Sequence, residues 1–444
     1  MSDWALGLYS ALMTLGQPLL RRKLARRGQQ EPGYLEAVDE RFGHYRQPLE
    51  AASELVWVHA VSLGETRTAG VLLKALRTQY PALRLLLTHG TATGREEGRG
   101  LLRPGDVQVW QPWDGPAAVN RFFNHFKPRL GLLMETEIWP NLVAEAKARG
   151  MPLVLVNARL SAKSLRHAQR LSFLALPAYS VLSAVYAQTE ADAGRFRQLG
   201  APVAGVFGNL KFDATPDADQ LAQGRDWRQT LAQPVLMFAS SREGEEDAFL
   251  EEIEAVAHMG RAYAAMNSVA NNSPMTFKPL IVPRHPQRFD EVAALIEGRG
   301  LRVSRRSQWT GGPAASDEAM NADVWLGDSL GEMALYYGLS DACLLGGSFA
   351  PLGGQNLIEA AACSCPVVMG PHTFNFTEAA ALAEAEGAAL RVAGMAEAVR
   401  AALELVNDSA ALAKAVTAGL AFAARNRGAT VRTVEALGEY LSSG

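Results

Sequence analysis

Residues 130–149 read LGLLMETEIWPNLVAEAKAR. Leu130–Met134 is an apolar run of strand length, and Pro140–Arg149 has helical spacing with proline in its first turn. Glu135 and Glu137 stand between the two. Two carboxylates directly after a buried strand repel each other unless they bind cations or hydroxyls, so the pair marks a candidate site. A buried strand followed by a polar turn and a helix is typical of a parallel α/β sheet.

The same alternation continues along the chain, with short apolar runs separated by segments of helical period. The polar stretch Lys211–Gln233 contains no strand pattern and is the predicted boundary between two α/β lobes. Met266–Lys278 and Trp309–Met320 have the composition of surface loops. The predicted strands are Leu55–Val61, Leu83–Thr88, Val107–Trp110, Leu130–Met134, Leu153–Asn157, Ala184–Ala187, Val235–Ser240, Pro279–Val282, Leu301–Ser304, Ala342–Leu345 and Pro366–Met369.

The N-terminus departs from this pattern. Residues 4–20 contain no charge, and Arg21–Arg27 holds five cations in seven positions. Seventeen residues are at the short limit for crossing a bilayer of ~30 Å, and cations that follow the apolar run do not fit a cleaved signal peptide. We expect residues 1–30 to be a membrane anchor with a basic flank, contacting lipid through residues 4–27. Whether the segment spans the bilayer or lies on it stays open, and a helix packed on the protein's own core is the alternative.

Composition excludes several classes of protein. With 48% hydrophobic residues and no Gly-X-Y period, the 444-residue chain is neither disordered nor collagen-like. Its net charge of −3 disfavours a nucleic-acid partner. Three cysteines cannot form a disulfide framework, and Cys363 and Cys365 are interpreted as buried small side chains. The motifs of P-loop NTPases, dinucleotide dehydrogenases, α/β-hydrolases and zincins are missing.

In the first lobe, Ser62-Leu63-Gly64-Glu65 follows a strand and begins a helix. The Glu65 carboxylate could act as a general base. It could equally cap the helix, whose dipole lowers a carboxylate pKa unless burial opposes it.

In the second lobe, four segments at strand ends suit an anionic, nucleotide-linked ligand. Hydroxyl, amide and cationic groups at helix starts bind anions, and a Gly-rich loop can hold phosphate through backbone amides. Such a lobe, facing a cleft with an acceptor lobe, suits glycosyl transfer. The segments are Ser240-Ser241-Arg242 before Glu243–Glu246, Pro283-Arg284-His285, Gly327–Glu332, and Gly346–Glu359, in which Glu359 is placed to bind a ribose diol.

At these residues the chain resembles the 3-deoxy-D-manno-octulosonic acid (Kdo) transferases of lipopolysaccharide synthesis. The resemblance extends from the N-terminus to about Arg391. It rests on Ser62–Glu65, Met134–Asn141, Asn157–Ser161, Gly208–Asp213, Val282–Pro286, Gly346–Glu359 and Gly370–Phe376.

The resemblance implies a GT-B fold: two Rossmann-like, doubly wound lobes facing a cleft, after an N-terminal membrane-anchor helix. The lobes are expected at 31–210 for the acceptor and 211–444 for the donor. It implies transfer of Kdo from CMP-Kdo to a hydroxyl of a tetra-acylated lipid A precursor (lipid IVA). The reaction is inverting, releases CMP and needs neither metal nor cofactor, and the enzyme is expected on the cytoplasmic side of the inner membrane.

The resemblance also assigns roles. Glu65 is the proton acceptor, and Glu135 and Lys211 stabilise the transition state. Ser240, Ser241 and Arg242 are expected in the donor site from the residues themselves. CMP contacts are expected at Pro283, Arg284, Leu330, Gly331, Glu332, Asn356, Leu357, Ile358 and Glu359.

Three positions depart from the family pattern. Arg242 and Gln355 stand where histidines are usual, and Leu330 replaces a methionine. Arg242 stays charged and Gln355 carries no charge, so neither can supply an imidazole. Two alternatives remain open from the sequence: another membrane-associated GT-B enzyme using a UDP- or ADP-sugar, and a non-catalytic membrane-bound sensor, which the presence of Glu65 disfavours.

Overall fold

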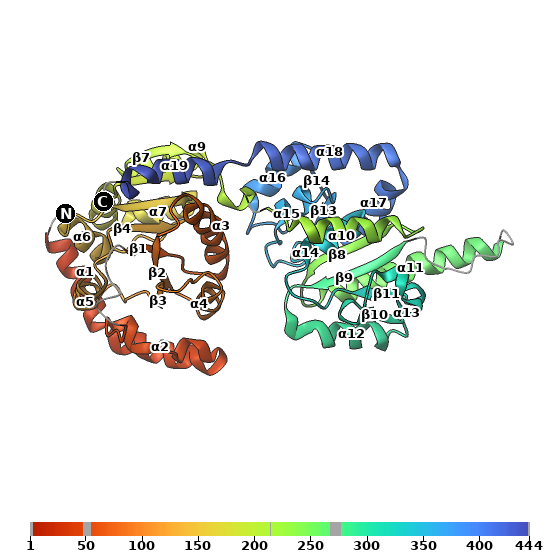
Figure 1. Ribbon diagram of the computed structural model, residues 1–444, viewed down its shortest axis with the longest axis horizontal. Helices are drawn as coiled ribbons and strands as arrows, with labels where there is room; N and C mark the ends of the chain where they lie inside the picture. Colours follow the sequence, from red (N-terminus) through yellow and green to blue (C-terminus); the bar gives the residue numbers. More distant parts are fainter. Residues whose placement is uncertain (1–2, 48–54, 214, 267–276, 443–444) are drawn as a thin grey trace. The chain divides into compact units, whose positions relative to one another are not determined.

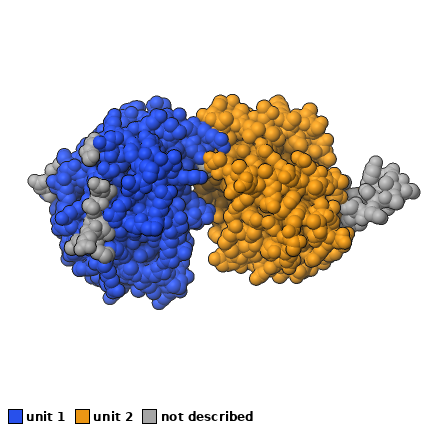
Figure 2. Space-filling view, viewed as in Figure 1, with its two compact units in different colours: residues 1–213, 426–444 blue, residues 214–425 orange. Residues whose placement is uncertain are grey.

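The structure is a computed structural model that describes residues 3–47, 55–213, 215–266 and 277–442. The chain divides into two compact units (Figure 2). Unit 1 comprises Met1–Asp213 and Asn426–Gly444, and unit 2 comprises Ala214–Arg425.

Unit 1 is built on a parallel sheet that has seven strands within the described residues, in the order β3-β2-β1-β4-β5-β6-β7 (Figure 1). The strands are β1 (Leu55–His59), β2 (Arg84–His89), β3 (Val107–Trp110), β4 (Leu130–Met134), β5 (Leu153–Ala158), β6 (Ala184–Ala187) and β7 (Val203–Val206). Successive side chains enter opposite clusters: Leu55 and Trp57 lie in one core, Val56 and Val58 in the other. Because both faces are buried, the strand sequences are mostly apolar instead of alternating.

Helices cover both faces of this sheet (Figure 1). They are α1 (Asp3–Leu15), α2 (Gln17–Gln30), α3 (Leu63–Gln79), α4 (Ala92–Arg99), α5 (Pro116–Phe126), α6 (Pro140–Ala148), α7 (Ala162–Arg170), α8 (Ser172–Ser180), α9 (Glu190–Gln198) and α19 (Ala429–Leu441), with the 3-10 turns η1 (Pro32–Leu35), η2 (Val38–Phe42) and η4 (Leu210–Asp213).

The C-terminal helix α19 belongs to unit 1, although the sequence prediction placed all of residues 211–444 in the second lobe. The Asp213 carboxylate accepts hydrogen bonds from the backbone N–H groups of Gly428 and Thr430 at the start of α19. Arg432 donates to the carbonyl of Phe207, and α19 packs on α3. These are contacts between distant parts of the sequence, which composition does not reveal.

Residues 4–20 form parts of two helices that meet at Gly16, and no helix within the described ranges has the length and apolarity to cross a membrane. The described residues therefore do not show the predicted membrane-anchor helix. Helix α1 packs against α6 and α8: Ser10 Oγ donates to Asn141 Oδ1 at 2.7 Å, and Trp4 stacks on Phe173 with ring centroids 5.8 Å apart. Tyr9 hydrogen-bonds the buried Asp114, whose pKa is raised by burial to about 6. The alternative of packing on the protein's own core holds for this face of α1.

Unit 2 contains a second parallel sheet, with seven strands in its described part and the order β10-β11-β9-β8-β12-β13-β14. Its strands are β8 (Val235–Ser241), β9 (Lys278–Pro283), β10 (Val303–Arg305), β11 (Val324–Leu326), β12 (Ala342–Leu345), β13 (Val367–Met369) and β14 (Ala389–Arg391). Its helices are α10 (Ala218–Gln229), α11 (Glu245–Met266), α12 (Phe289–Gly298), α13 (Asp317–Asn321), α14 (Met333–Leu339), α15 (Leu357–Ala362), α16 (Thr377–Ala385), α17 (Met395–Asn407) and α18 (Ser409–Arg425), with 3-10 turns η5 (Pro286–Arg288), η6 (Arg306–Gln308) and η7 (Pro313–Ala315).

Both sheets are doubly wound, as predicted. In unit 1 the chain proceeds from β1 outward to β3 and then returns to place β4 on the other side of β1. In unit 2 the corresponding reversal lies between β8 and β12. Ligands of open α/β sheets bind beside the carboxyl ends of the strands at such a reversal. The residues after β1, β4, β8 and β12 therefore lie at the candidate ligand sites of the two sheets.

Cys343, Cys363 and Cys365 are buried and free, which confirms their interpretation as small core side chains. The stretch Trp309–Met320, predicted as a loop, contains η7 and most of α13. The other predicted loop, Met266–Lys278, lies mostly outside the described residues, since 267–276 are not described.

Candidate active site

Glu65 lies in the first turn of α3, directly after β1. Ser62 is the N-cap, and its hydroxyl accepts from the Glu65 N–H. The Glu65 carboxylate reaches back to accept from the backbone N–H of Val61 and from Ser62 Oγ, each at 2.9 Å. Glu65 is thus both a capping residue and a candidate base. Burial raises its pKa to about 7, outweighing the two hydrogen bonds, so the carboxyl group changes protonation near neutrality.

Glu135 and Glu137 follow β4, the strand beside β1. Glu135 has a φ of +59°, a conformation rare for a residue with a side chain and often found at functional sites. The charges of both residues raise the pKa of Glu65 further, which places the three carboxyl groups within electrostatic reach of one another. The structure therefore assembles an acidic cluster at the strand reversal of unit 1.

Lys211 provides the opposite charge. Its Nζ lies 3.5 Å from Glu135 Oε1, and both side chains are partly exposed. The predicted catalytic residues Glu65, Glu135 and Lys211 therefore meet in one unit, although Lys211 lies in η4, far along the chain.

Asn157, at the end of β5, holds the turn that carries Lys211. Its Oδ1 accepts from the backbone N–H of Leu210 at 3.0 Å, and Asn209 Oδ1 accepts from the N–H of Lys211. Asn157 is buried and has a φ of +52°. Its Nδ2 has no hydrogen-bond partner among the described residues. Asn157 belongs to one of the motifs of the family resemblance, but no role is predicted for it from the sequence. An asparagine near the end of a buried strand is the feature that could have indicated one.

In unit 2, Ser240 and Ser241 end β8 and Arg242 follows it, and their environments differ. Ser241 is buried and donates to Glu246 Oε1 at 2.8 Å, so its hydroxyl group is already hydrogen-bonded inside the protein. Arg242 is partly exposed, and its Nε lies 3.0 Å from Glu243 Oε2. Ser240, which has a φ of +56°, is partly exposed like Arg242, so these two predicted residues, and not the buried Ser241, can face an anion.

Pro283 ends β9, the strand next to β8, and Arg284 follows it. The backbone N–H of Arg284 donates to the carbonyl of Ser241 at 3.0 Å, which joins the two strand ends. The pKa of His285 is lowered by burial and then by the charges of Arg242 and Arg284. The two arginines therefore lie near each other, as a site for a phosphate requires.

Leu330, Gly331 and Glu332 follow β11. Leu330 is 73% exposed, and the carbonyl of Gly331 accepts from Gln220 Nε2. Glu332 accepts from Arg306 at 2.9 Å and from Ser329. The Glu332 carboxylate is therefore engaged within the protein, and a ligand would meet the backbone and Leu330 first.

The Gly-rich segment Gly346–Glu359 differs from its prediction. The backbone N–H groups of Gly347, Phe349 and Ala350 donate to the carboxylate of Glu245, so these amides are not available to a phosphate. Further along, Asn356 caps α15 by accepting from the N–H of Ile358 at 3.1 Å. Leu357 and Ile358 are buried, and Glu359 lies in the first turn of α15.

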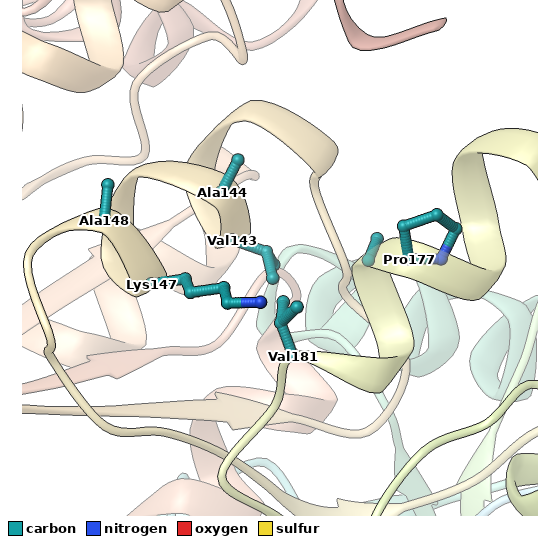
Figure 3. Close-up of a pocket in the computed structure, with 7 residues that line it drawn as sticks. Val143, Ala144, Lys147, Ala148, Pro177 and Val181 are labelled. Atoms are coloured by element: carbon teal, nitrogen blue, oxygen red, sulfur yellow. The ribbon is translucent and has the colours of Figure 1, made fainter. Parts of the chain in front are cut away.

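A mostly apolar depression of about 310 Å³ lies elsewhere in unit 1, between α6 and α8 (Figure 3). Lys147 extends over it toward Val143 and Val181. None of the predicted site residues lines it; the lining residues are Val143, Ala144, Lys147, Ala148, Pro177, Ala178 and Val181.

Two doubly wound units, one with an acidic cluster at its strand reversal and one with arginines at the same place, have the architecture expected of a GT-B-like glycosyltransferase. Relatives agree. Residues 36–214 match the family model described as 3-Deoxy-D-manno-octulosonic-acid transferase (kdotransferase). A 3-deoxy-D-manno-octulosonic acid transferase of Bordetella pertussis is 44% identical over 98% of this chain and 99% of its own. One of Haemophilus influenzae is 33% identical, covering 98% of each chain. The chain therefore belongs to the 3-deoxy-D-manno-octulosonic acid transferase family, and it is an enzyme.

Solved structures bear on the fold alone. A glycosyltransferase from Rickettsia africae aligns with a TM-score of 0.54 at 12% identity, covering 88% of this chain and all of its own. The match supports the two-unit α/β architecture.

Proposed function

We propose that the protein transfers Kdo from CMP-Kdo to a hydroxyl of a tetra-acylated lipid A precursor (lipid IVA), releasing CMP, in lipopolysaccharide biosynthesis. Family membership over nearly the whole chain supports the transferred sugar. The observation that carries the chemistry is Glu65, a partly buried carboxylate with a pKa near 7 beside the Glu135–Lys211 pair.

In the proposed step, Glu65 removes the proton from the acceptor hydroxyl as its oxygen bonds to the anomeric carbon of Kdo. The bond between that carbon and the CMP phosphate oxygen breaks, and its electron pair leaves with CMP. Attack opposite to the leaving group inverts the anomeric configuration. A base whose pKa is near the working pH suits this role, because about half of it is ionised while it still holds the proton it takes.

Lys211 and the arginines have separate tasks in this proposal. Positive charge in the transition state offsets the negative charge that develops on the departing phosphate. Lys211 offers it in unit 1, while Arg242 and Arg284 hold the donor in unit 2. A donor with one phosphate carries less charge than a nucleoside diphosphate sugar, so we propose a reaction without a metal ion.

We further propose that α1 and α2 lie on the cytoplasmic face of the inner membrane. One side of α1 packs on the protein, while Leu8, Leu12 and Leu15 of α1 and Leu19 of α2 are exposed. Arg22, Lys23 and Arg26 are exposed along α2. Apolar side chains beside exposed cations are typical of helices that lie in the interface of an anionic membrane. This arrangement would bring unit 1 to an acceptor whose acyl chains stay in the bilayer.

The test of the activity is a transfer assay. The full chain is incubated with CMP-Kdo and tetra-acylated lipid A precursor in detergent micelles, and products are identified by mass. We expect an acceptor enlarged by one or more Kdo residues, with CMP released. Turnover of a UDP- or ADP-sugar, with none of CMP-Kdo, would refute the proposal.

The membrane proposal is tested by co-sedimentation with vesicles containing anionic phospholipid. The double variant Leu8→Glu/Leu12→Glu places two charges on the exposed side of α1 and should lose most vesicle binding. Leu382→Glu, an exposed leucine of unit 2, is the matched control and should bind like the wild type. Equal binding by all three proteins would contradict the role of α1.

A further inference from the structure

Glu245 is the most completely hydrogen-bonded carboxylate at the strand ends of unit 2. Its side chain is 3% exposed. Oε2 accepts from the backbone N–H of Gly347 at 2.7 Å and of Arg242 at 3.0 Å. Oε1 accepts from the N–H of Phe349 at 3.0 Å and of Ala350 at 3.1 Å. An ionised carboxylate has about four acceptor positions, and all four are filled here by backbone amides.

This carboxylate lies where open α/β sheets bind ligands. Arg242 follows β8, and Gly347–Ala350 follows β12, so Glu245 bridges the two strand ends at the reversal of unit 2. The backbones approach closely there: a Cβ on Gly346 would stand 2.2 Å from the carbonyl oxygen of Ser240. Gly347 has a φ of +70°, which lets the turn point its amides at Glu245. A concave run of amides of this kind ordinarily holds an anionic ligand.

The turn continues into the segment predicted to touch the donor. The N–H of Gly354 donates to the carbonyl of Gly347 at 2.7 Å, which sets the path of Gly354 and Gln355 into the cap residue Asn356. On the other side, Glu245 fixes the backbone of Arg242, whose guanidinium is partly exposed. One buried carboxylate thus joins the two segments that would hold the phosphate and the nucleoside.

We propose that Glu245 is a positioning residue for the donor: its carboxylate occupies the amide cradle of residues 347–350 and thereby fixes Arg242 and Gly354–Asn356 in their binding geometry. This inference rests on the proposed function. The phosphate of the donor is then held by side chains, Arg242 and Arg284 among them, and not by the amides of this turn.

The test compares Glu245→Gln and Glu245→Ala with the wild type by calorimetric titration with CMP and by steady-state kinetics on the full chain. Glutamine keeps the size but turns an NH₂ group toward two amide donors, which leaves them unpaired. We expect CMP affinity and the KM for CMP-Kdo to worsen about ten- to hundredfold. The kcat at saturating donor and the KM for the acceptor should stay within about twofold of the wild type. Glu252→Gln, on the same helix, is the matched control and should change neither.

Hydrogen exchange separates positioning from general destabilisation. In Glu245→Gln, the two amides that face the NH₂ group, either Phe349 and Ala350 or Gly347 and Arg242, should exchange faster, while those of β8 and β12 keep their protection. Unchanged CMP affinity in Glu245→Gln, or equal rises in the KM of donor and acceptor, would overturn the inference. If the wild type bound no CMP, the proposed function would fail instead. If Glu245→Ala does not fold, the result for Glu245→Gln alone decides the test.

Discussion

Two glutamates occupy equivalent places in the two units and differ in what surrounds them. Gly64-Glu65 follows β1 and Gly244-Glu245 follows β8, each at the start of a helix and beside the reversal of its sheet. Burial raises the pKa of both carboxyl groups. Glu65 accepts two hydrogen bonds in the described structure, whereas Glu245 accepts four.

The number of internal donors separates the two roles. A carboxylate with about four acceptor positions and two partners can still take a proton from a substrate. A carboxylate with four partners has no acceptor position left for a substrate proton, so its role is structural. The same two residues at the same place in a doubly wound sheet therefore yield a candidate base in unit 1 and a structural tie in unit 2.

Removing the base should have the largest effect. We expect Glu65→Gln to lower kcat about 10²- to 10⁴-fold, since that is what general base catalysis ordinarily contributes. CMP affinity should be unchanged, because CMP is proposed to bind unit 2. Glu190→Gln, which changes an exposed glutamate in the first turn of α9, is the control. Turnover of Glu65→Gln near the wild-type rate would exclude Glu65 as the base.

The second largest effect is expected when the cation beside Glu135 is removed. Lys211→Met removes the charge 3.5 Å from Glu135 Oε1 and should lower kcat about ten- to hundredfold, with little change in CMP affinity. Lys211→Arg keeps the charge and should recover part of the rate in the same kinetic assay. A weaker CMP affinity with normal kcat would show that Lys211 binds the donor and does not stabilise the transition state.

A smaller change is expected in the pH profile. As a base, Glu65 works when deprotonated, so kcat/KM should rise with pH through about 7. Glu135→Gln removes a negative charge that raises the pKa of Glu65, and the acid limb should move to lower pH. Burial is the larger cause of the raised pKa, so the limb should stay above the ordinary value of 4.5. A limb that moves upward would contradict this electrostatic coupling.

The smallest effect concerns Arg242, which stands where the family usually has histidine. In Arg242→His the new imidazole would lie near Arg284, whose charge disfavours its protonated form. We expect CMP affinity to fall about two- to fivefold at pH 7 and to recover at lower pH, where the imidazole is charged. Arginine stays charged throughout, so the wild type should lack this recovery. Equal pH dependence of the two proteins would show that the charge of residue 242 is not used.

Much of the fold could be predicted from apolar runs. The predicted strands Val107–Trp110, Leu130–Met134, Ala184–Ala187 and Ala342–Leu345 match the structure in both bounds. The prediction missed β7, β11 and β14. Strands β7 and β14 lie at sheet edges and are partly exposed, and β11 has three residues, so none contains a long apolar run.

The site could be predicted in part. Glu65 and Glu135 follow recognisable buried strands. Lys211 had a role only through the family resemblance, and the prediction placed it in the donor lobe with residues 211–444. The structure instead places Lys211 in unit 1, beside Glu135, a contact between distant parts of the sequence that local pattern cannot show. The interpretation of Gly346–Glu359 as a phosphate cradle was wrong for Gly347, Phe349 and Ala350. Their partner Glu245 lies 102 to 105 residues earlier, a contact that local sequence cannot show.

The most direct test measures Glu65→Gln and Glu245→Gln side by side, recording kcat for Kdo transfer at saturating donor and the Kd for CMP. The two-role account predicts opposite losses: Glu65→Gln loses turnover and keeps CMP affinity, and Glu245→Gln loses CMP affinity and keeps most of its turnover. Matching losses in the two variants, or the reverse pattern, would contradict it.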